Sequence, residues 1–382
     1  SKTRFISDFA RVNYSYNDRY LLQASVRRDG SSVFGSNKKW GYFPAVSAAW
    51  RLSQEAFIKK FNFINDLKLR ASYGVTGNAL GFGAYTAQQL FVSQGTYYNA
   101  GSFDRAIGVS QGSNPDLQWE KTETKNIGLD FALFQGRLSG SFDVYNKVTS
   151  NMIFRYAVST TIVPGGNIWA NGGKMQNKGV ELVLNGTPVK TKDFSWNSSI
   201  NFAINKNTIV DMNGPSKYGV NTDSVLYSDP EGPGQTNSTL QILKVGKPLG
   251  QFFSLIYMGK DANGNSQFLK HDGSLTTAPA IRTDYFYVGS PQPKLLAGWS
   301  NSFRYKNFDL NFFIRGVFGN KIFNATRADL SYTVNAAVNN ISSYVTDDKI
   351  TDSRNNSYST RYIENGSYVR FDNLTLGYLI KI

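Results

Sequence analysis

The chain has 382 residues, a formal net charge of +14, no cysteine and a single histidine. These counts exclude thiolate catalysis, disulfides, Cys-type zinc sites and metal sites built on a pair of histidines. His271 lies in the polar stretch Lys270–Gly273, which is typical of a solvated loop. Because the carboxylates are also scattered, we expect no enzymatic activity, no cofactor and no catalytic or metal site.

Aromatic and uncharged polar residues dominate the composition. Aromatic residues make up 14% of the chain and charged residues 18%, below the roughly 25% charged residues of soluble domains. No segment approaches the roughly 18 consecutive apolar residues of a membrane helix, so a helical membrane protein is excluded. Lysine and arginine are scattered singly, which argues against a nucleic acid partner.

In chain order, apolar and polar residues alternate over segments of about ten residues, as expected of strands with two different faces. In residues 19–28 one face carries Leu22 and Val26, and the other carries Gln23 and Ser25. Similar segments follow at residues 67–75, 126–133, 138–145, 180–188, 194–205, 296–305 and 308–315. About ten residues is the length that a tilted strand needs to cross a bilayer. We count about eleven strands in all.

The connections between these strands alternate between short and long. The short ones are residues 17–18, 53–66, 134–137, 189–193 and 306–307, and the long ones are residues 29–39, 77–119, 150–174, 206–294 and 320–367. A soluble β-sandwich has no reason to collect its long connections at one end, whereas outer-membrane barrels have short periplasmic turns and long extracellular loops. The sequence therefore predicts an all-β fold, namely an antiparallel transmembrane β-barrel portion.

The predicted strand number suggests that the barrel is not closed by this chain alone. Every backbone group in lipid must be paired, so only a closed cylinder is stable there. Single-chain bacterial barrels have an even number of strands, and about eleven is odd. We therefore expect residues 1–382 to be part of a larger barrel, or one chain of a split protein.

Several strings resemble SusC-family TonB-dependent transporters. The first three are Arg27–Gly35 (RRDGSSVFG), Trp40–Arg51 (WGYFPAVSAAWR) and Leu69–Asn78 (LRASYGVTGN). Further strings follow in the same order at residues 177–182, 289–294, 305–310, 316–320 and 367–378. The resemblance implies a 22-stranded barrel in the outer membrane of a Bacteroidota bacterium. About eleven of those strands would lie here, with the plug domain and the final hairpin outside residues 1–382.

The resemblance also implies a function and partners. Family members import oligosaccharides or peptides, are energised by TonB through the plug region, and work beneath a SusD-like surface lipoprotein, which allows a dimer of SusC–SusD pairs. By analogy, we expect residues 77–119 to contact the lipoprotein lid. On the residues alone, a passive porin or adhesion barrel and a soluble glycan-binding module remain open as alternatives.

Aromatic residues in the long connections are candidate substrate contacts, because a ring can stack on a sugar or a peptide side chain while amides bond its polar edges. The candidates are Tyr97, Tyr98, Asn99, Asn167, Trp169, Tyr218 and Tyr227. Trp169 is the strongest, since Gly165, Gly166, Gly172 and Gly173 leave little other bulk around it. The alternative is that these rings pack the loops against one another.

Residues Asp261–Asn265 alternate oxygen-bearing side chains in the manner of a calcium loop. Their glycine, Gly264, is at the fourth position of the stretch, whereas a calcium loop requires glycine at the sixth. The Asn263–Gly264 pair instead favours a two-residue hairpin turn.

Overall fold

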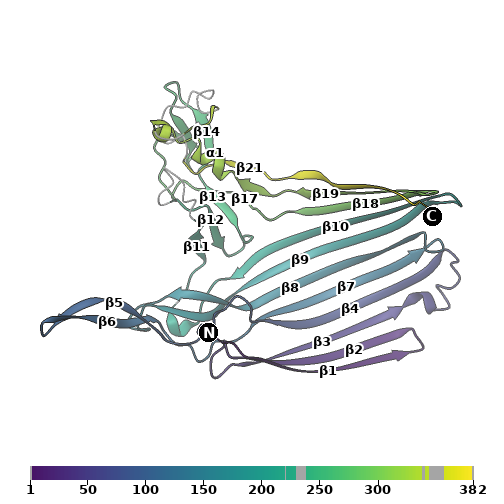
Figure 1. The fold of residues 1–382 in the computed structure, drawn as a ribbon, viewed down its shortest axis with the longest axis horizontal. Helices are drawn as coiled ribbons and strands as arrows, with labels where there is room; N and C mark the ends of the chain where they lie inside the picture. Colours follow the sequence, from purple (N-terminus) through teal and green to yellow (C-terminus); the bar gives the residue numbers. More distant parts are fainter. Residues whose placement is uncertain (1, 220, 229–237, 338–339, 344–356, 381–382) are drawn as a thin grey trace. The chain divides into compact units, whose positions relative to one another are not determined.

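The computed structural model describes residues 2–219, 221–228, 238–337, 340–343 and 357–380. They form two compact units. The first comprises residues 1–223, 299–312 and 374–382, and the second comprises residues 224–298 and 313–373. Within the described residues the largest sheet has eleven strands in the order β1-β2-β3-β4-β7-β8-β9-β10-β18-β19-β22, and most of them are labelled in Figure 1. The predicted number of strands is therefore confirmed.

The strands of this sheet are long. They are β1 (Phe5–Tyr16), β2 (Tyr20–Ser31), β3 (Trp40–Arg51), β4 (Ile64–Asn78), β7 (Glu120–Leu133), β8 (Leu138–Ala157), β9 (Asn167–Lys190), β10 (Phe194–Asp211), β18 (Leu295–Tyr305), β19 (Phe308–Phe318) and β22 (Tyr368–Tyr378). Short turns join many neighbours, as predicted. Asn17 and Asp18, between β1 and β2, have φ angles of 51° and 53°, as in the type I′ turns that match the twist of hairpin strands.

The two sides of the sheet differ in polarity, as the alternation predicts. Directly paired residues project from the same side, and the register places Leu129, Phe142, Leu182 and Phe202 in one row across β7 to β10. We call this side the apolar face, and the opposite side, which carries Arg70, Asp130 and Asp143, the polar face. On the apolar face Phe142 is 41% exposed. An exposed apolar row of this kind marks a contact with a membrane or with another protein.

Strands β8 to β10 extend beyond the predicted boundaries. The connection predicted over residues 150–174 shrinks to residues 158–166, because β8 ends at Ala157 and β9 begins at Asn167. The 24 residues of β9 exceed the roughly ten that cross a bilayer. A strand that continues beyond a bilayer can be polar on both sides, which explains why the alternation stops before the strand does.

The predicted connection 77–119 contains a hairpin, β5 (Leu90–Asn99) and β6 (Ser102–Gln111). Figure 1 shows it extending away from the ends of the long strands. Residues on either side of it pack against the β2–β3 connection in a core that includes Phe34, Phe43, Leu117 and Trp119. The Gly35 N–H donates to the Leu117 carbonyl at 2.9 Å, so the two connections support each other.

The second unit has a core of its own. Its small sheets comprise β11 (Ser224–Tyr227), β12 (Gln241–Lys244), β13 (Gln251–Ser254), β14 (Tyr257–Lys260), β15 (Ser266–Leu269), β16 (Leu275–Thr276), β17 (Phe286–Gly289), β20 (Lys321–Phe323) and β21 (Ile363–Asn365). The described residues of the two units also include the helical segments η1 (Leu52–Gln54), η2 (Ser216–Tyr218), α1 (Ala325–Asp329) and η3 (Thr333–Ala337). The Tyr358 hydroxyl donates to the Leu240 carbonyl, and burial raises the pKa of Tyr358. No helix among the described residues is long and apolar enough to span a bilayer.

Candidate functional site

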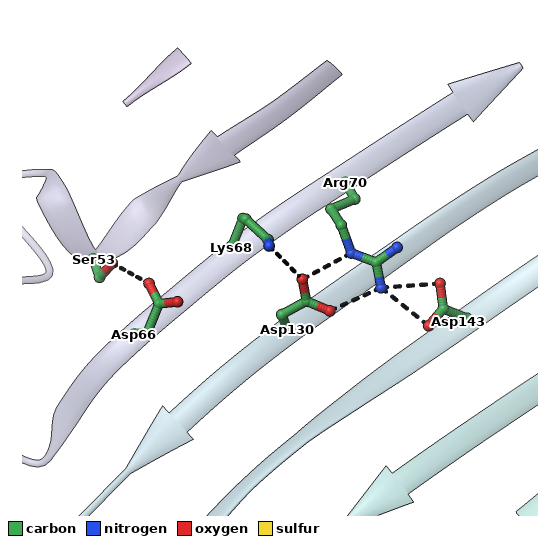
Figure 2. A network of polar contacts seen from close by, with 6 residues as sticks. All are labelled: Ser53, Asp66, Lys68, Arg70, Asp130 and Asp143. Carbon is green, nitrogen blue, oxygen red and sulfur yellow. Dashed lines mark hydrogen bonds and ion pairs between the residues drawn. The ribbon is translucent and has the colours of Figure 1, made fainter. Parts of the chain in front are cut away.

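Charged side chains from three neighbouring strands meet on the polar face. The Arg70 guanidinium on β4 binds Asp130 on β7 through two hydrogen bonds of 2.8 and 2.9 Å, and reaches Asp143 on β8 at 3.1 Å. Lys68 also binds Asp130 at 2.8 Å. Figure 2 shows the four side chains as one network. Two cations and two carboxylates balance each other, and the paired Arg–Asp contact fixes the orientation of the guanidinium.

Gly128 on β7 makes this network possible. It is paired with both Arg70 and Asp143, so it lies between two groups that are two strands apart. A Cβ at this position would stand 2.4 Å from Asp143 Oδ1 and 2.7 Å from an Arg70 nitrogen. A side chain at this position would therefore force the ends of the Arg70 and Asp143 side chains to shift from the positions in which they meet across β7.

A further contact fixes the short-connection end of β4. Ser53, in η1, donates to Asp66 at 2.8 Å, as Figure 2 also shows. Nearby, Glu55 accepts from the Trp50 indole at 3.1 Å and from the Tyr20 hydroxyl at 3.0 Å. These bonds, to Trp50 first, lower the pKa of Glu55. The alternation in the sequence predicts that Lys68, Arg70 and Asp130 lie on the polar faces of their strands. It does not predict the register between the strands, on which the pairing of these side chains depends.

Trp169, predicted to lie in a loop, is in β9. The ring packs on the core around Phe34 and Leu117, and its N–H donates to Gln111 Oε1 at 3.1 Å. Asn167 donates to the Gly165 carbonyl at 3.1 Å. Both side chains are therefore engaged by their own chain, an arrangement that favours the packing alternative over ligand stacking for these two residues.

Tyr218 lies against a second cluster, which contains Tyr156 and Ile168. Next to it, Lys217 and Asn37 both bind Asp116, each at 2.9 Å. The Asn37 bond and then the lysine charge lower the pKa of Asp116. These contacts to Asp116 join three connections that are far apart in the sequence. Tyr218 thus lies against the cluster of Ile168, whereas the Trp169 ring packs on the separate core around Phe34.

The hairpin tyrosines are the exposed members of the predicted set. Tyr98 is 67% exposed and stacks edge-on with Phe103, which is 75% exposed, at 5.3 Å. Tyr97 is also exposed, and Asn99 donates to Asp104 at 3.2 Å. These rings are free to meet a partner or ligand, so they remain candidates for such contacts.

The remaining predicted positions lie in the second unit. Tyr227 is in β11, where burial raises its pKa. Asp261 accepts from the backbone N–H groups of Asn263 and Asn265, so its carboxylate organises a turn. This turn joins β14 to β15 through residues 261–265, a longer loop than the predicted two-residue turn. His271 lies in the exposed turn between β15 and β16, as predicted.

Replacing Trp169 separates packing from ligand stacking. We expect Trp169→Ala to lower the free energy of unfolding by about 1–3 kcal/mol, less than for a fully buried tryptophan, because the ring packs on the core around Phe34 and Leu117. Tyr98→Ala, at an exposed ring, should change stability little and serves as the control. Denaturant unfolding of the two variants and the wild type measures the change. Unchanged stability of Trp169→Ala would contradict the packing role and leave ligand stacking open.

Comparison with known proteins gives a consistent result. The family model described as "TonB dependent receptor-like, beta-barrel" matches residues 1–381. The chain is 32% identical to TonB-dependent receptor P3 of Formosa agariphila, over 99% of this chain and 39% of that protein, and 30% identical to TonB-dependent receptor SusC of Bacteroides thetaiotaomicron, over 99% and 38%. The solved RagAB peptide importer in its closed-closed state superposes with a TM-score of 0.82 at 27% identity, over 99% of this chain and 41% of that one. The chain thus spans about two fifths of these relatives.

Proposed function

The chain belongs to the TonB-dependent receptor-like β-barrel family, and on that basis we propose that it is the barrel portion of a TonB-energised outer-membrane importer of oligosaccharides or peptides. A plug domain and a closing hairpin would lie in other parts of the transporter, which would reside in the outer membrane of a Bacteroidota bacterium. The polar face would then line the interior of the barrel and the apolar face would contact lipid.

The observation that carries this proposal is the match of nearly the whole chain to the RagAB importer, at a TM-score of 0.82 and 27% identity. That structure is named as a peptide importer, whereas the relative SusC is named only as a TonB-dependent receptor. The exposed apolar row on one side of the sheet and the charge network on the other agree with a membrane-embedded wall. Because the names of these two relatives do not decide between the ligand classes, the proposal includes both oligosaccharides and peptides.

Energised uptake tests the function directly. Cells that carry the transporter should take up labelled oligosaccharide or peptide pools, and deletion of TonB or collapse of the proton-motive force should abolish that uptake. The matched control is a strain without the transporter. Uptake that persists without TonB would contradict the proposal and would favour a passive porin.

The β5–β6 hairpin is the proposed contact for a SusD-like lipoprotein. It exposes apolar side chains on both strands, including Phe91, Tyr98, Phe103 and Ile107. Contiguous exposed apolar surface marks sites of protein association. A lipoprotein lid would cover these side chains, and two such pairs could associate as a dimer.

Removing the hairpin tip tests this contact. Deletion of residues 94–102 should weaken co-purification of the lipoprotein while leaving barrel assembly intact, because β5 and β6 are not part of the eleven-stranded sheet. Heat-modifiable migration in gels checks assembly, and a pull-down measures retention of the lipoprotein. Deletion of the exposed residues 160–162, in the connection between β8 and β9, is the control. Unchanged retention would place the contact elsewhere.

A further inference from the structure

A row of lysines borders the apolar face on the side of the long connections. The register aligns Tyr73, Lys125, Asn146, Lys178 and Lys206 across β4, β7, β8, β9 and β10. β4 leads from Tyr73 into the long connection that holds the β5–β6 hairpin. The three lysines of this row, which we call the lysine row, are exposed.

The next row of the same face is apolar. Residues two apart in a strand project from the same side, so Ile127, Val144 and Ile204 lie directly beside the lysine row. Ile127 is 62% exposed and Ile204 is 53% exposed. A groove of about 810 Å³ runs over both rows and is lined by the three lysines and these apolar residues. The surface thus combines a hydrocarbon-like floor with a cationic rim.

No ion pair with a described residue neutralises the lysine row. Among the described residues, no acidic group forms an ion pair with Lys125, Lys178 or Lys206. Lys178 and Lys206 are directly paired across β9 and β10, and like charges in such a pair are destabilising. Glu123 lies on the same face, but Lys121 and Lys174 accompany it further along the strands. An external anion would offset this repulsion.

We propose that this groove binds lipopolysaccharide, with the phosphates of the acylated glycolipid on the lysine row and its acyl chains on the apolar row. The inference rests on the proposed function, which places the long connections at the outer leaflet. Neighbouring strands are about 4.8 Å apart, so Lys125 and the Lys178–Lys206 pair stand roughly 10 Å apart and can contact separate phosphates. Basic clusters at the edge of a membrane-embedded surface recognise anionic lipid headgroups in this manner.

The test uses the intact transporter in detergent and rough lipopolysaccharide as the probe. In native mass spectrometry, the Lys125→Gln/Lys178→Gln/Lys206→Gln variant should retain the lipid about ten- to a hundredfold more weakly than the wild type, as expected for three lysine contacts. The matched control, Lys60→Gln/Lys190→Gln/Lys192→Gln, removes the same charge from exposed lysines at the short-connection end. It should bind as the wild type does.

Further experiments test whether the lysine row binds the lipid through its phosphates. Replacing the three lysines by arginine should preserve binding, and enzymatic removal of the lipid phosphates should weaken it. Equal retention by the glutamine variant and the wild type would overturn the proposal, as would equal competition by phosphatidylglycerol. Heat-modifiable migration confirms that each variant is folded. If the wild-type transporter bound the lipid but showed no TonB-dependent uptake, only the proposed import function would be refuted. Failure of the import function and failure of the lipid site are therefore distinguishable.

Discussion

Phe142→Arg should lower the free energy of unfolding of the membrane-embedded transporter by about 2–4 kcal/mol, the cost of an arginine near the bilayer midplane on the lipid side of a barrel. Phe142 is on β8, exposed on the apolar face, in a row with Leu129 and Leu182. The guanidinium of the introduced arginine would be surrounded by hydrocarbon, without a carboxylate partner in this apolar row. Denaturant unfolding in lipid vesicles measures the loss.

The neighbouring Ser141→Arg variant is the matched control. Ser141 projects from the polar face and pairs with Asp130, so an arginine there would meet a carboxylate rather than lipid. We expect a change within about 0.5 kcal/mol, as for most surface substitutions. Equal costs at the two positions would mean that the apolar face does not contact lipid.

Arg70→Ala should lower the free energy of unfolding by about 1.5–3 kcal/mol, because it leaves two carboxylates without their main partner. The side chains of Arg70, Asp130 and Asp143 are 33%, 27% and 18% exposed. Partial solvation of this kind keeps the expected loss below the 3–5 kcal/mol of a fully buried ion pair. Thermal and denaturant unfolding of the purified transporter measure the change.

Two variants show whether geometry or charge determines this effect. Arg70→Lys keeps the charge but cannot form the paired hydrogen bonds to Asp130, so it should recover only part of the stability. Lys68→Ala removes a single contact to the same carboxylate and should cost less than about 1 kcal/mol. An Arg70→Ala variant as stable as the wild type would show that the network is dispensable for folding.

The main architecture follows from local sequence patterns. Alternation in segments such as residues 19–28 and 126–133 gives the strands and their faces, because side-chain direction in a strand depends only on parity. Turn residues such as Asn17 and Asp18 give the short connections. The sequence outside the alternating segments has a less regular pattern of apolar and polar residues. The ends of β8 and β9 and the β5–β6 hairpin were therefore not predictable from alternation.

The contacts at the candidate sites depend on register, which alternation does not contain. Lys125, Lys178 and Lys206 are scattered singly along the chain, and the pairing of four strands brings them into one row. In the same way Arg70 meets Asp143 across Gly128, where the absence of a side chain leaves room for both groups. Trp169 illustrates the converse case, since flanking glycines suggested an open loop while pairing with Arg155 places the residue within a sheet.

Glycines covered by a neighbouring side chain recur on the polar face, and they determine how smooth that surface is. The ring of Tyr145 covers Gly179, as Arg70 and Asp143 cover Gly128. Side chains that would otherwise project from the wall lie along it instead. In the proposed barrel this leaves a wider bore with fewer protruding groups on which a plug or a passing ligand could catch. Substituting such a glycine would narrow the passage even in a barrel that still assembles.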